Sequence, residues 1–245
     1  MLIDMHNHTR VSSPDSVLSP EELIELARER GLDGLCVTEH FFIEGAEVAR
    51  EAGLRLRFPV FRGIEARTDL GDMLVFGYYH DVPDGIPFAD LARQVHESAG
   101  VLFAAHPFRA DGFNLRTSLR RLGLDLHADW RSVEAMMHLD GIEVANGANS
   151  METNSSAGLL AHRMCLPGIG GSDAHGPEDV GRAVTRFNRK IETEEALVVE
   201  LRKGTTEPFL MPAPSGGLLT MGLWGTRGVE KGNPEFRNPH QFFGR

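Results

Sequence analysis

The chain has 245 residues, of which 41% are hydrophobic, and a formal net charge of -10 at pH 7. The length suits a single large barrel domain, and the acidic balance argues against a general nucleic-acid binder, which would carry a basic stripe. Two cysteines, Cys36 and Cys165, cannot build a disulfide framework; with no membrane-spanning apolar stretch and no signal-peptide pattern, we expect a cytoplasmic protein that binds no membrane.

Segments typical of strands and helices alternate along most of the chain, starting with the apolar run "LID" and a helix over 19–31. Ser19 as N-cap, Pro20 at the first helical position and Gly31 as the stop mark this helix. The further strands expected are "LDGLCVTEH", "RFPVFRGIEART", "DMLVFGYY", "VLFAAHP", "LDGIEVAN", "LPGIGGSDAH" and "RAVTRF". The further helices expected are "EGAEVAREAG", "PFADLARQVHESAG", roughly 155–165 and "TEEALVVELRKG". This alternation favours parallel βα units.

The sequence changes character at about Met211, where it becomes rich in Gly, Pro and Asn and loses periodicity. We therefore expect one folded domain over 1–210 and a Gly/Pro-rich tail over 211–245. The tail's aromatic residues are expected to dock on the body or on a neighbouring subunit. The second arrangement would make a homo-oligomer. These residues are Trp224, Phe236, Phe242 and Phe243.

Metal-competent side chains follow the C-terminal ends of several predicted strands. They are His6, His8, Glu39, His40, Glu65, His106, Asp173 and His175. Parallel βα folds collect their active sites at that end of the sheet. A lone histidine at a strand end is more often a capping or hydrogen-bonding residue. Only the occurrence of all these residues at the same end of the sheet indicates a metal site. Because so many polar groups would be unfavourable to bury unpaired, the pattern predicts a metal cluster.

The opening stretch "MLIDMHNHTR" places two histidines one residue apart. Side chains in a strand alternate with a period of two, so Asp4, His6 and His8 are expected to point the same way. We expect His6 and His8 to share a metal ion, and the deeper Asp4 to orient one of the ligand histidines.

In chain order, "DMHNH", "VTEH", "GIEA", "AHP" and "GSDAH" resemble the motifs of the polymerase and histidinol phosphatase (PHP) superfamily. The resemblance covers roughly residues 1–205. It implies an α/β fold, an irregular (β/α)7 barrel with its metal site at the C-terminal ends of the strands. It also implies two or three divalent metal ions and hydrolysis of phosphoesters.

The resemblance implies metal ligands residue by residue. The first ion would take His6, His8, Glu65 and Asp173. A second ion would be bridged by Glu65 and bound by His106, and a third would use His40, His175 and Asp15. The family often has a further histidine after the third motif, where this chain offers Asp72 or, further on, His80. The second site is therefore expected to be oxygen-rich or incompletely closed.

Imidazole and carboxylate ligands without a thiolate suit Zn, Mn or Fe and do not choose among them. Four residues are candidates for catalytic roles. Arg109, and also Arg10, could bind phosphate oxygens, Asn146 could orient substrate or water, and Glu39 could accept a proton or orient a ligand histidine. A solvated surface position is the alternative for each arginine, and a turn position for Asn146.

Together these features predict a metal-dependent hydrolase that cleaves phosphoester bonds of a small phosphorylated metabolite or nucleotide through a metal-activated water. The enzyme could be a phosphatase or a phosphodiesterase. Two alternatives remain: an exonuclease-type phosphodiesterase, which the missing basic surface disfavours, and a catalytically silent metal-binding module.

Overall fold

The computed structural model describes residues 1–109, 114–121 and 134–212. Its strands are β1 (Leu2–Asp4), β2 (Gly34–His40), β3 (Val60–Thr68), β4 (Gly71–Phe76), β5 (Val101–Ala104), β6 (Gly141–Asn146), β7 (Gly168–Gly171), β8 (Ala183–Arg186) and β9 (Glu207–Leu210). Its α-helices are α1 (Pro20–Glu29), α2 (Glu44–Leu56), α3 (Phe88–Glu97), α4 (Leu115–Arg121), α5 (Met151–Met164) and α6 (Glu194–Lys203). A short 3-10 helix covers Glu134–His138.

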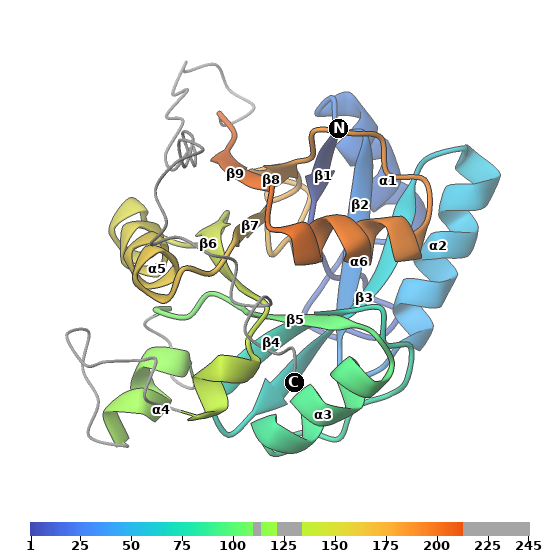
Figure 1. Cartoon of the computed structure of the whole chain (residues 1–245). Coiled ribbons are helices and arrows are strands. Elements are labelled where there is room, and N and C mark those ends of the chain that lie inside the picture. The colour runs from blue at the N-terminus through green and yellow to red at the C-terminus, as the bar shows by residue number, and fades with distance from the viewer. Residues whose placement is uncertain (110–113, 122–133, 213–245) are drawn as a thin grey trace.

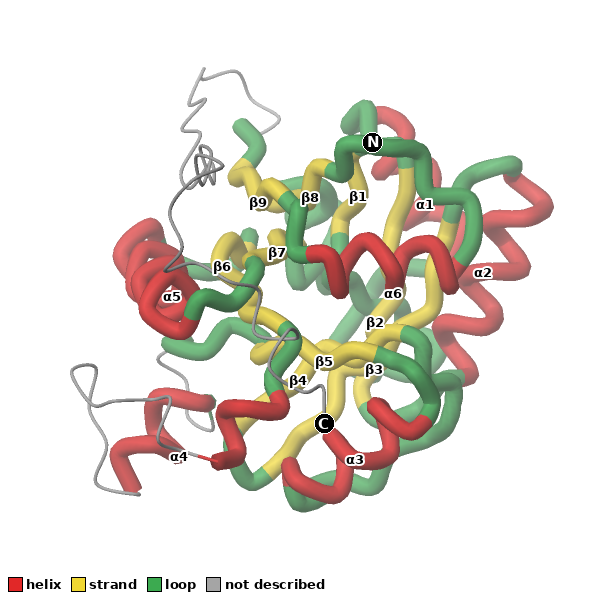
Figure 2. The backbone as a smooth tube through the Cα atoms, viewed as in Figure 1, coloured by secondary structure: helices red, strands yellow, loops and turns green. Residues whose placement is uncertain are grey.

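The strands form one sheet in the order β7-β6-β5-β4-β3-β2-β1-β8-β9. Neighbours within β1–β3 and within β5–β7 are parallel, whereas β4 is antiparallel to both of its neighbours. The segment that follows β1 lies beside the segment that follows β7. There, the Asp173 amide donates a hydrogen bond to the His6 carbonyl (2.8 Å), and the His8 amide donates one to the Ala174 carbonyl (3.1 Å). Strands β1–β7 thereby nearly close a barrel (Figure 2). The predicted irregular (β/α)7 barrel is confirmed, and the sheet has two further strands, β8 and β9.

The barrel interior is filled by apolar side chains, among them Met5, Leu74 and Phe103. Leu197 and Leu201 of α6 join this cluster. Helix α6 lies across the end where the strands begin, because Arg202 donates hydrogen bonds to the carbonyls of Ala99 and Gly100, just before β5 (Figure 1). The opposite end of the barrel is therefore left for polar residues.

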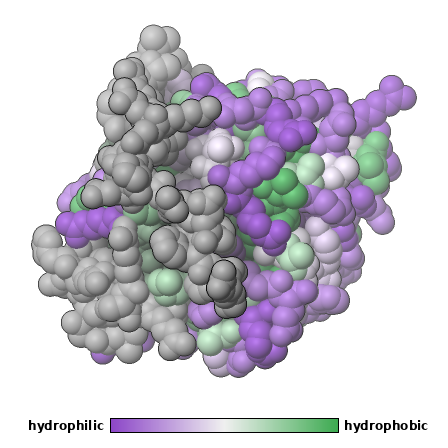
Figure 3. All heavy atoms as spheres, viewed as in Figure 1, coloured by the Kyte–Doolittle hydropathy of each residue, from purple (hydrophilic) through white to green (hydrophobic). Residues whose placement is uncertain are grey.

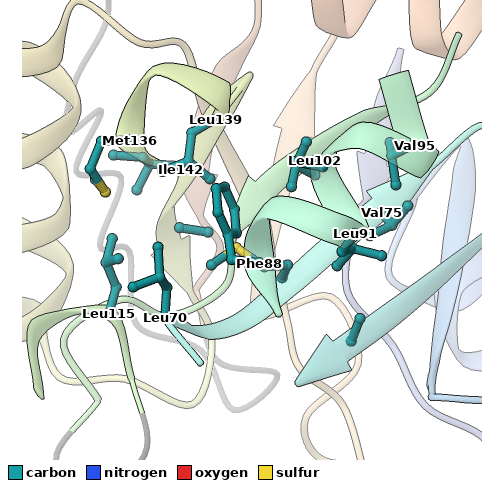
Figure 4. Packing of buried hydrophobic residues seen from close by; sticks show 14 of the residues in the cluster. Leu70, Val75, Phe88, Leu91, Val95, Leu102, Leu115, Met136, Leu139 and Ile142 are labelled. Carbon is teal, nitrogen blue, oxygen red and sulfur yellow. The ribbon is translucent and has the colours of Figure 1, made fainter. Parts of the chain in front are cut away.

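The outer helices cover the barrel with apolar faces. Phe88, Leu91 and Val95 of α3 follow the helical period and pack towards strand residues such as Val75 and Leu102 (Figure 4). Helices α1 and α2 lie on one side of the barrel and α5 on another (Figure 1). Residues of α1 and α2 share a separate buried cluster with residues of β2.

Local signals explain where the helices begin, including one helix that the sequence placed incorrectly. The Ser19 hydroxyl accepts a hydrogen bond from the Glu22 amide (3.2 Å), as the capping pattern predicts. Helix α5 begins at Met151, earlier than expected, with Ser150 accepting from Thr153 (3.2 Å). Its first turn is polar and lacks apolar periodicity, so only the cap marked its start. The sequence reading also missed β9, α4 and the 3-10 helix.

Near the end of the described residues, the Met211 amide donates a hydrogen bond to the Arg182 carbonyl (2.7 Å). The proposed boundary at 210 and the docking of the tail aromatics stay predictions, because 213–245 lie outside the described residues. Hydrophilic residues cover much of the described surface visible in Figure 3. Within the described ranges no helix combines the length and apolar character needed to cross a membrane.

Candidate metal centre

The metal-competent residues meet at the barrel end opposite α6, where β1, β2, β5 and β7 end. A pocket of about 510 Å³ opens there, a size typical of small-molecule sites. Seven of the predicted site residues line it, namely Asp15, His40, Glu65, His106, Arg109, Asp173 and His175. His6 and His8 are fully buried and contact this set.

Four side-chain atoms lie close together at this end of the barrel. The Nε2 atoms of His6 and His8 lie 3.0 Å apart. Each lies 3.4 Å from Oε2 of Glu65, and they lie 3.5 and 3.4 Å from Oδ1 of Asp173. Ligand atoms held about 2.0–2.2 Å from one tetrahedral ion are separated by about 3.3 Å. His6, His8 and Glu65 form one group whose ligand atoms could hold an ion, and Asp173 forms another with His6 and His106. The residues expected for the first ion therefore lie together, with Asp173 beside both histidines.

Glu65 presents its two oxygens to different partners. Oε1 lies 2.8 Å from Nε2 of His106, while Oε2 faces the two histidines after β1. Neither Oε2 of Glu65 nor Nδ1 of His106, both buried, has a hydrogen-bond partner among the described residues. Oε2 of Glu65 does lie 3.1 Å from Nδ1 of His40. Buried polar atoms are nearly always paired, so Nδ1 of His106 is the atom that lacks a neighbour of this kind. This arrangement suits a carboxylate that bridges two ions.

A third group lies towards the pocket mouth. Oδ2 of Asp15 is 3.2 Å from Nε2 of His40 and 3.4 Å from Nε2 of His175. The rings of His40 and His175 stack on His8 with centroids 4.3 and 4.4 Å away. Ligand atoms of His8, His40 and His175 lie within 4.8 Å of one another. The structure thus brings together the three residues expected to bind a third ion, and adds His8 beside them.

The charged groups in this cluster shift one another's pKa values. Burial alone would lower the pKa of His6, but the carboxylates of Asp173, Glu143 and Glu65 raise it well above its ordinary value. Burial would likewise raise the pKa of Asp173, yet His6 and His8 hold it well below its usual range. Burial lowers the pKa of His8 to about 4. A divalent ion would take over the role of the imidazolium protons, so binding should release protons.

Glu39 lies behind the pocket and does not line it. Its carboxylate accepts hydrogen bonds from the amide and hydroxyl of Thr9 and from the hydroxyl of Ser13. The Ser13 hydroxyl lies 3.2 Å from Nδ1 of His8. These contacts do not suit a group that accepts a proton from substrate. They suit the other expected role, in which Glu39 orients a ligand histidine, here through Ser13.

Arg109 and Asn146 differ in their access to the pocket. The Arg109 guanidinium lines the pocket and donates hydrogen bonds to Asp173 and to Oδ1 of Asn146 (3.2 Å). Asn146 is fully buried, and its Nδ2 donates to Glu143 (3.0 Å) and Asp173 (3.3 Å). Arg109 is therefore placed to meet a substrate. Asn146 does not line the pocket but contacts Arg109 and Asp173, and its role in orienting substrate or water stays a prediction.

The sequence reading missed Glu143 and misplaced the contacts of Asp4. Glu143 is buried in β6, with Oε1 3.0 Å from Nδ1 of His6 and Oε2 accepting from the His106 amide (2.7 Å). Asp4 accepts hydrogen bonds from the backbone amides of His6, Ser172 and Gly181. The role predicted for Asp4, orienting an imidazole, belongs to Glu143. The available signal was a single charged residue inside the apolar strand "GIEVAN".

The backbone around the site is unusual at two predicted ligands. His106 and Asp173 have positive φ angles of 24° and 56°, a conformation that is strained by about 1–3 kcal/mol for such residues. Strand β7 also approaches His6 closely, because a Cβ at Gly171 would lie 2.4 Å from Cβ of His6. Only glycine fits there. The strands are thus held in positions that serve the side-chain cluster.

Of the remaining candidates, only Asp72 joins the site. Asp72 lines the pocket, and its ligand atom lies within 4.8 Å of those of Glu65 and His106. His80 is exposed and packs its ring against Tyr78. Arg10 is exposed and is not part of the pocket lining. Asp72 is therefore the alternative that the structure favours after the third motif.

Comparison with known proteins agrees with this arrangement. The family model of the PHP domain matches residues 4–122, and the PHP-associated model matches residues 152–206. An uncharacterized protein of Methanocaldococcus jannaschii is 26% identical over 151 residues, covering 58% of this chain and 86% of that protein. A PolC-type DNA polymerase III of Oceanobacillus iheyensis is 31% identical over 103 residues, covering 41% of this chain and 6% of the polymerase.

A solved structure shares the fold. It is a two-domain protein from Bacteroides vulgatus, described as containing a predicted PHP-like metal-dependent phosphoesterase. The TM-score is 0.63 at 21% sequence identity, and the match covers 86% of this chain and 64% of that one. The two family models cover the strands β2–β5 and β7 and the predicted metal ligands from His6 to His175, but not β6. The chain belongs to the PHP family.

Proposed function

We propose that the protein is a metal-dependent phosphoesterase that hydrolyses a small phosphorylated metabolite or nucleotide. The observation that carries this proposal is the close approach of the imidazole and carboxylate atoms of His6, His8, Glu65 and Asp173 at the floor of the pocket. Such a set of imidazole and carboxylate atoms suits Zn, Mn or Fe. The second and third groups, around His106 and His40, would hold one or two further ions.

When bound, the ions would lower the pKa of a water molecule and offset charge on the phosphoryl oxygens. The protein's own residues would bind and orient the substrate. Arg109 is held at the pocket wall by Asp173 and Asn146, so its guanidinium is placed to bind a phosphate oxygen. Glu143 and Glu39 would fix the directions of His6 and His8, directly and through Ser13.

A nuclease-type phosphodiesterase is the second candidate, favoured by the similarity to the PolC-type polymerase. The net charge of -10 weighs against it, because binding to a nucleic-acid backbone depends on cationic side chains. The pocket of about 510 Å³ also suits a small substrate better than a nucleic-acid strand. We therefore favour the small-molecule substrate, with monoester or diester cleavage to be separated by experiment.

The test is a hydrolysis screen on chelator-stripped protein before and after Mn²⁺ is added back. Substrates would be p-nitrophenyl phosphate, its bis-ester, nucleotides, sugar phosphates, amino-alcohol phosphates and single-stranded DNA. We expect release of product from small esters, dependent on Mn²⁺, and none from a His6→Ala/His8→Ala control prepared in the same way. Preferential digestion of DNA would favour the nuclease. Loaded protein that cleaves none of these esters would indicate the silent metal-binding module.

A further inference from the structure

The reversed strand β4 brings one more carboxylate to the metal-binding end of the barrel. Because β4 is antiparallel to β3 and β5, it begins at the rim where the parallel strands end. Asp72 is the second residue of β4, opposite Arg67 of β3. Its carbonyl accepts a hydrogen bond from the Ala105 amide (2.9 Å), directly before His106. The topology thus places Asp72 beside His106.

The pleat of β4 directs the Asp72 side chain towards the barrel axis. Leu74, two residues further along the strand, belongs to the cluster that fills the barrel interior. Side chains two residues apart in a strand share a face, so Asp72 lies one level above this core, at the pocket floor. The side chain is 18% exposed and lines the pocket. A carboxylate on this face is directed at the cluster and not at bulk solvent.

Asp72 lies close to Glu65 and His106. One ligand atom each of Glu65, Asp72 and His106 lie within 4.8 Å of one another. Glu65 and His106 are buried, and Nδ1 of His106 has no hydrogen-bond partner among the described residues. Two carboxylates at this distance repel each other in a site of low dielectric. A cation bound among the three residues would remove the repulsion.

The alternative is that Asp72 serves only as an ion-pair partner of Arg67. Nε of Arg67 lies 3.6 Å from Oδ1 of Asp72, and its Nη1 lies 3.8 Å from Oδ1 of Asp84. The Arg67 side chain is 49% exposed, and ion pairs this open contribute little to stability. Asp84 is 62% exposed and does not belong to the group around Glu65. Asp72 and Asp84 thus share Arg67, and only Asp72 faces the cluster.

We propose that Asp72 is the third protein ligand of the second metal ion, with Glu65 and His106, so that this ion is bound by two carboxylates and one imidazole. The inference rests on the metal centre of the proposed function. Oxygen-rich sets suit harder ions such as Mn²⁺, whereas sets with more imidazole suit Zn²⁺. The second position therefore prefers Mn²⁺ and exchanges its ion more readily than the position beside His6 and His8.

The test measures metal binding on the full chain, independently of catalysis. Chelator-stripped wild type, Asp72→Asn and Asp84→Asn would be titrated with Mn²⁺, with free Mn²⁺ followed by electron paramagnetic resonance and bound metal by elemental analysis. We expect Asp72→Asn to lose one Mn²⁺ equivalent, or to bind it about 10–100-fold more weakly, while the other ions stay. Asp84→Asn should behave as wild type, because it changes only the partner of Arg67.

A second variant keeps the test decisive if Asp72→Asn is unstable. Asp72→His should restore the ion and raise the Zn²⁺ to Mn²⁺ ratio at this position when both metals compete. Unchanged stoichiometry and affinity in Asp72→Asn, or an unchanged metal ratio in Asp72→His, would overturn the inference. If the variants give either of these results while the wild type binds metal and hydrolyses phosphoesters, the proposed function stands. A wild type that binds no ion would overturn both.

Discussion

Alanine at His6 or at His8 should remove hydrolysis almost completely, and the double variant should be scarcely worse than either single one. The two Nε2 atoms lie 3.0 Å apart, and each lies 3.4 Å from Oε2 of Glu65, so either replacement opens the same ion site. Residues that act as one unit show strongly non-additive effects. We expect each single loss to exceed the roughly 10–100-fold typical of a residue that only supports a ligand. Product release and metal content would be measured on all three variants.

The matched control is His80→Ala. His80 lies in the same half of the chain, is exposed and contacts Tyr78 instead of the cluster. It should keep the wild-type metal content and rate, and circular dichroism should show that all variants fold. If the double variant loses the sum of two large single effects, His6 and His8 do not share an ion.

The second large effect is expected for Glu143→Gln. The two oxygens of Glu143 face Nδ1 of His6 and the His106 amide, and the second also accepts from Asn146. Glutamine has one oxygen and one NH₂ group, so it cannot accept hydrogen bonds at both positions. His6 and His106 would lose their fixed directions. Metal affinity and kcat should each fall about 10–100-fold, measured by metal titration and steady-state kinetics.

The control is Glu200→Gln, which alters another buried carboxylate. Glu200 lies on α6 at the far end of the barrel and pairs with Lys203 (2.6 Å). Its replacement should lower the melting temperature without changing metal affinity. If Glu143→Gln likewise changes only the melting temperature, Glu143 supports the fold and does not position the ligands.

The strand ends were predictable because their signals are local. An apolar run followed by His, Glu or Asp marks a strand that ends in a polar site, and "DMHNH", "GIEA" and "GSDAH" each carry that pattern. Parallel pairing then gathers the ends of distant strands at one rim. For this reason the placement of His6, Glu65 and Asp173 in one cluster follows from the sequence.

The supporting contacts were not predictable in the same way. Glu143 and Asn146 act through hydrogen bonds to residues far away in the chain, such as His6 and Asp173. Alternation in β1 predicted that Asp4 would lie beneath the histidines, but β1 ends at Asp4 and the irregular backbone beyond it breaks the alternation. The reversed direction of β4 depends on tertiary pairing, so Asp72 could be named as an alternative but not placed.

The central claim is that one cluster at the barrel end binds more than one divalent ion. The most direct measurement is the number of ions bound per chain, determined by elemental analysis after chelator-stripped protein is dialysed to equilibrium against Mn²⁺ or Zn²⁺. We predict at least two ions per chain for wild type, and loss of more than one for Glu65→Gln, because Glu65 presents one oxygen to His6 and His8 and the other to His106. A wild type that binds one ion or none, or a Glu65→Gln variant that keeps the wild-type number, would contradict the account.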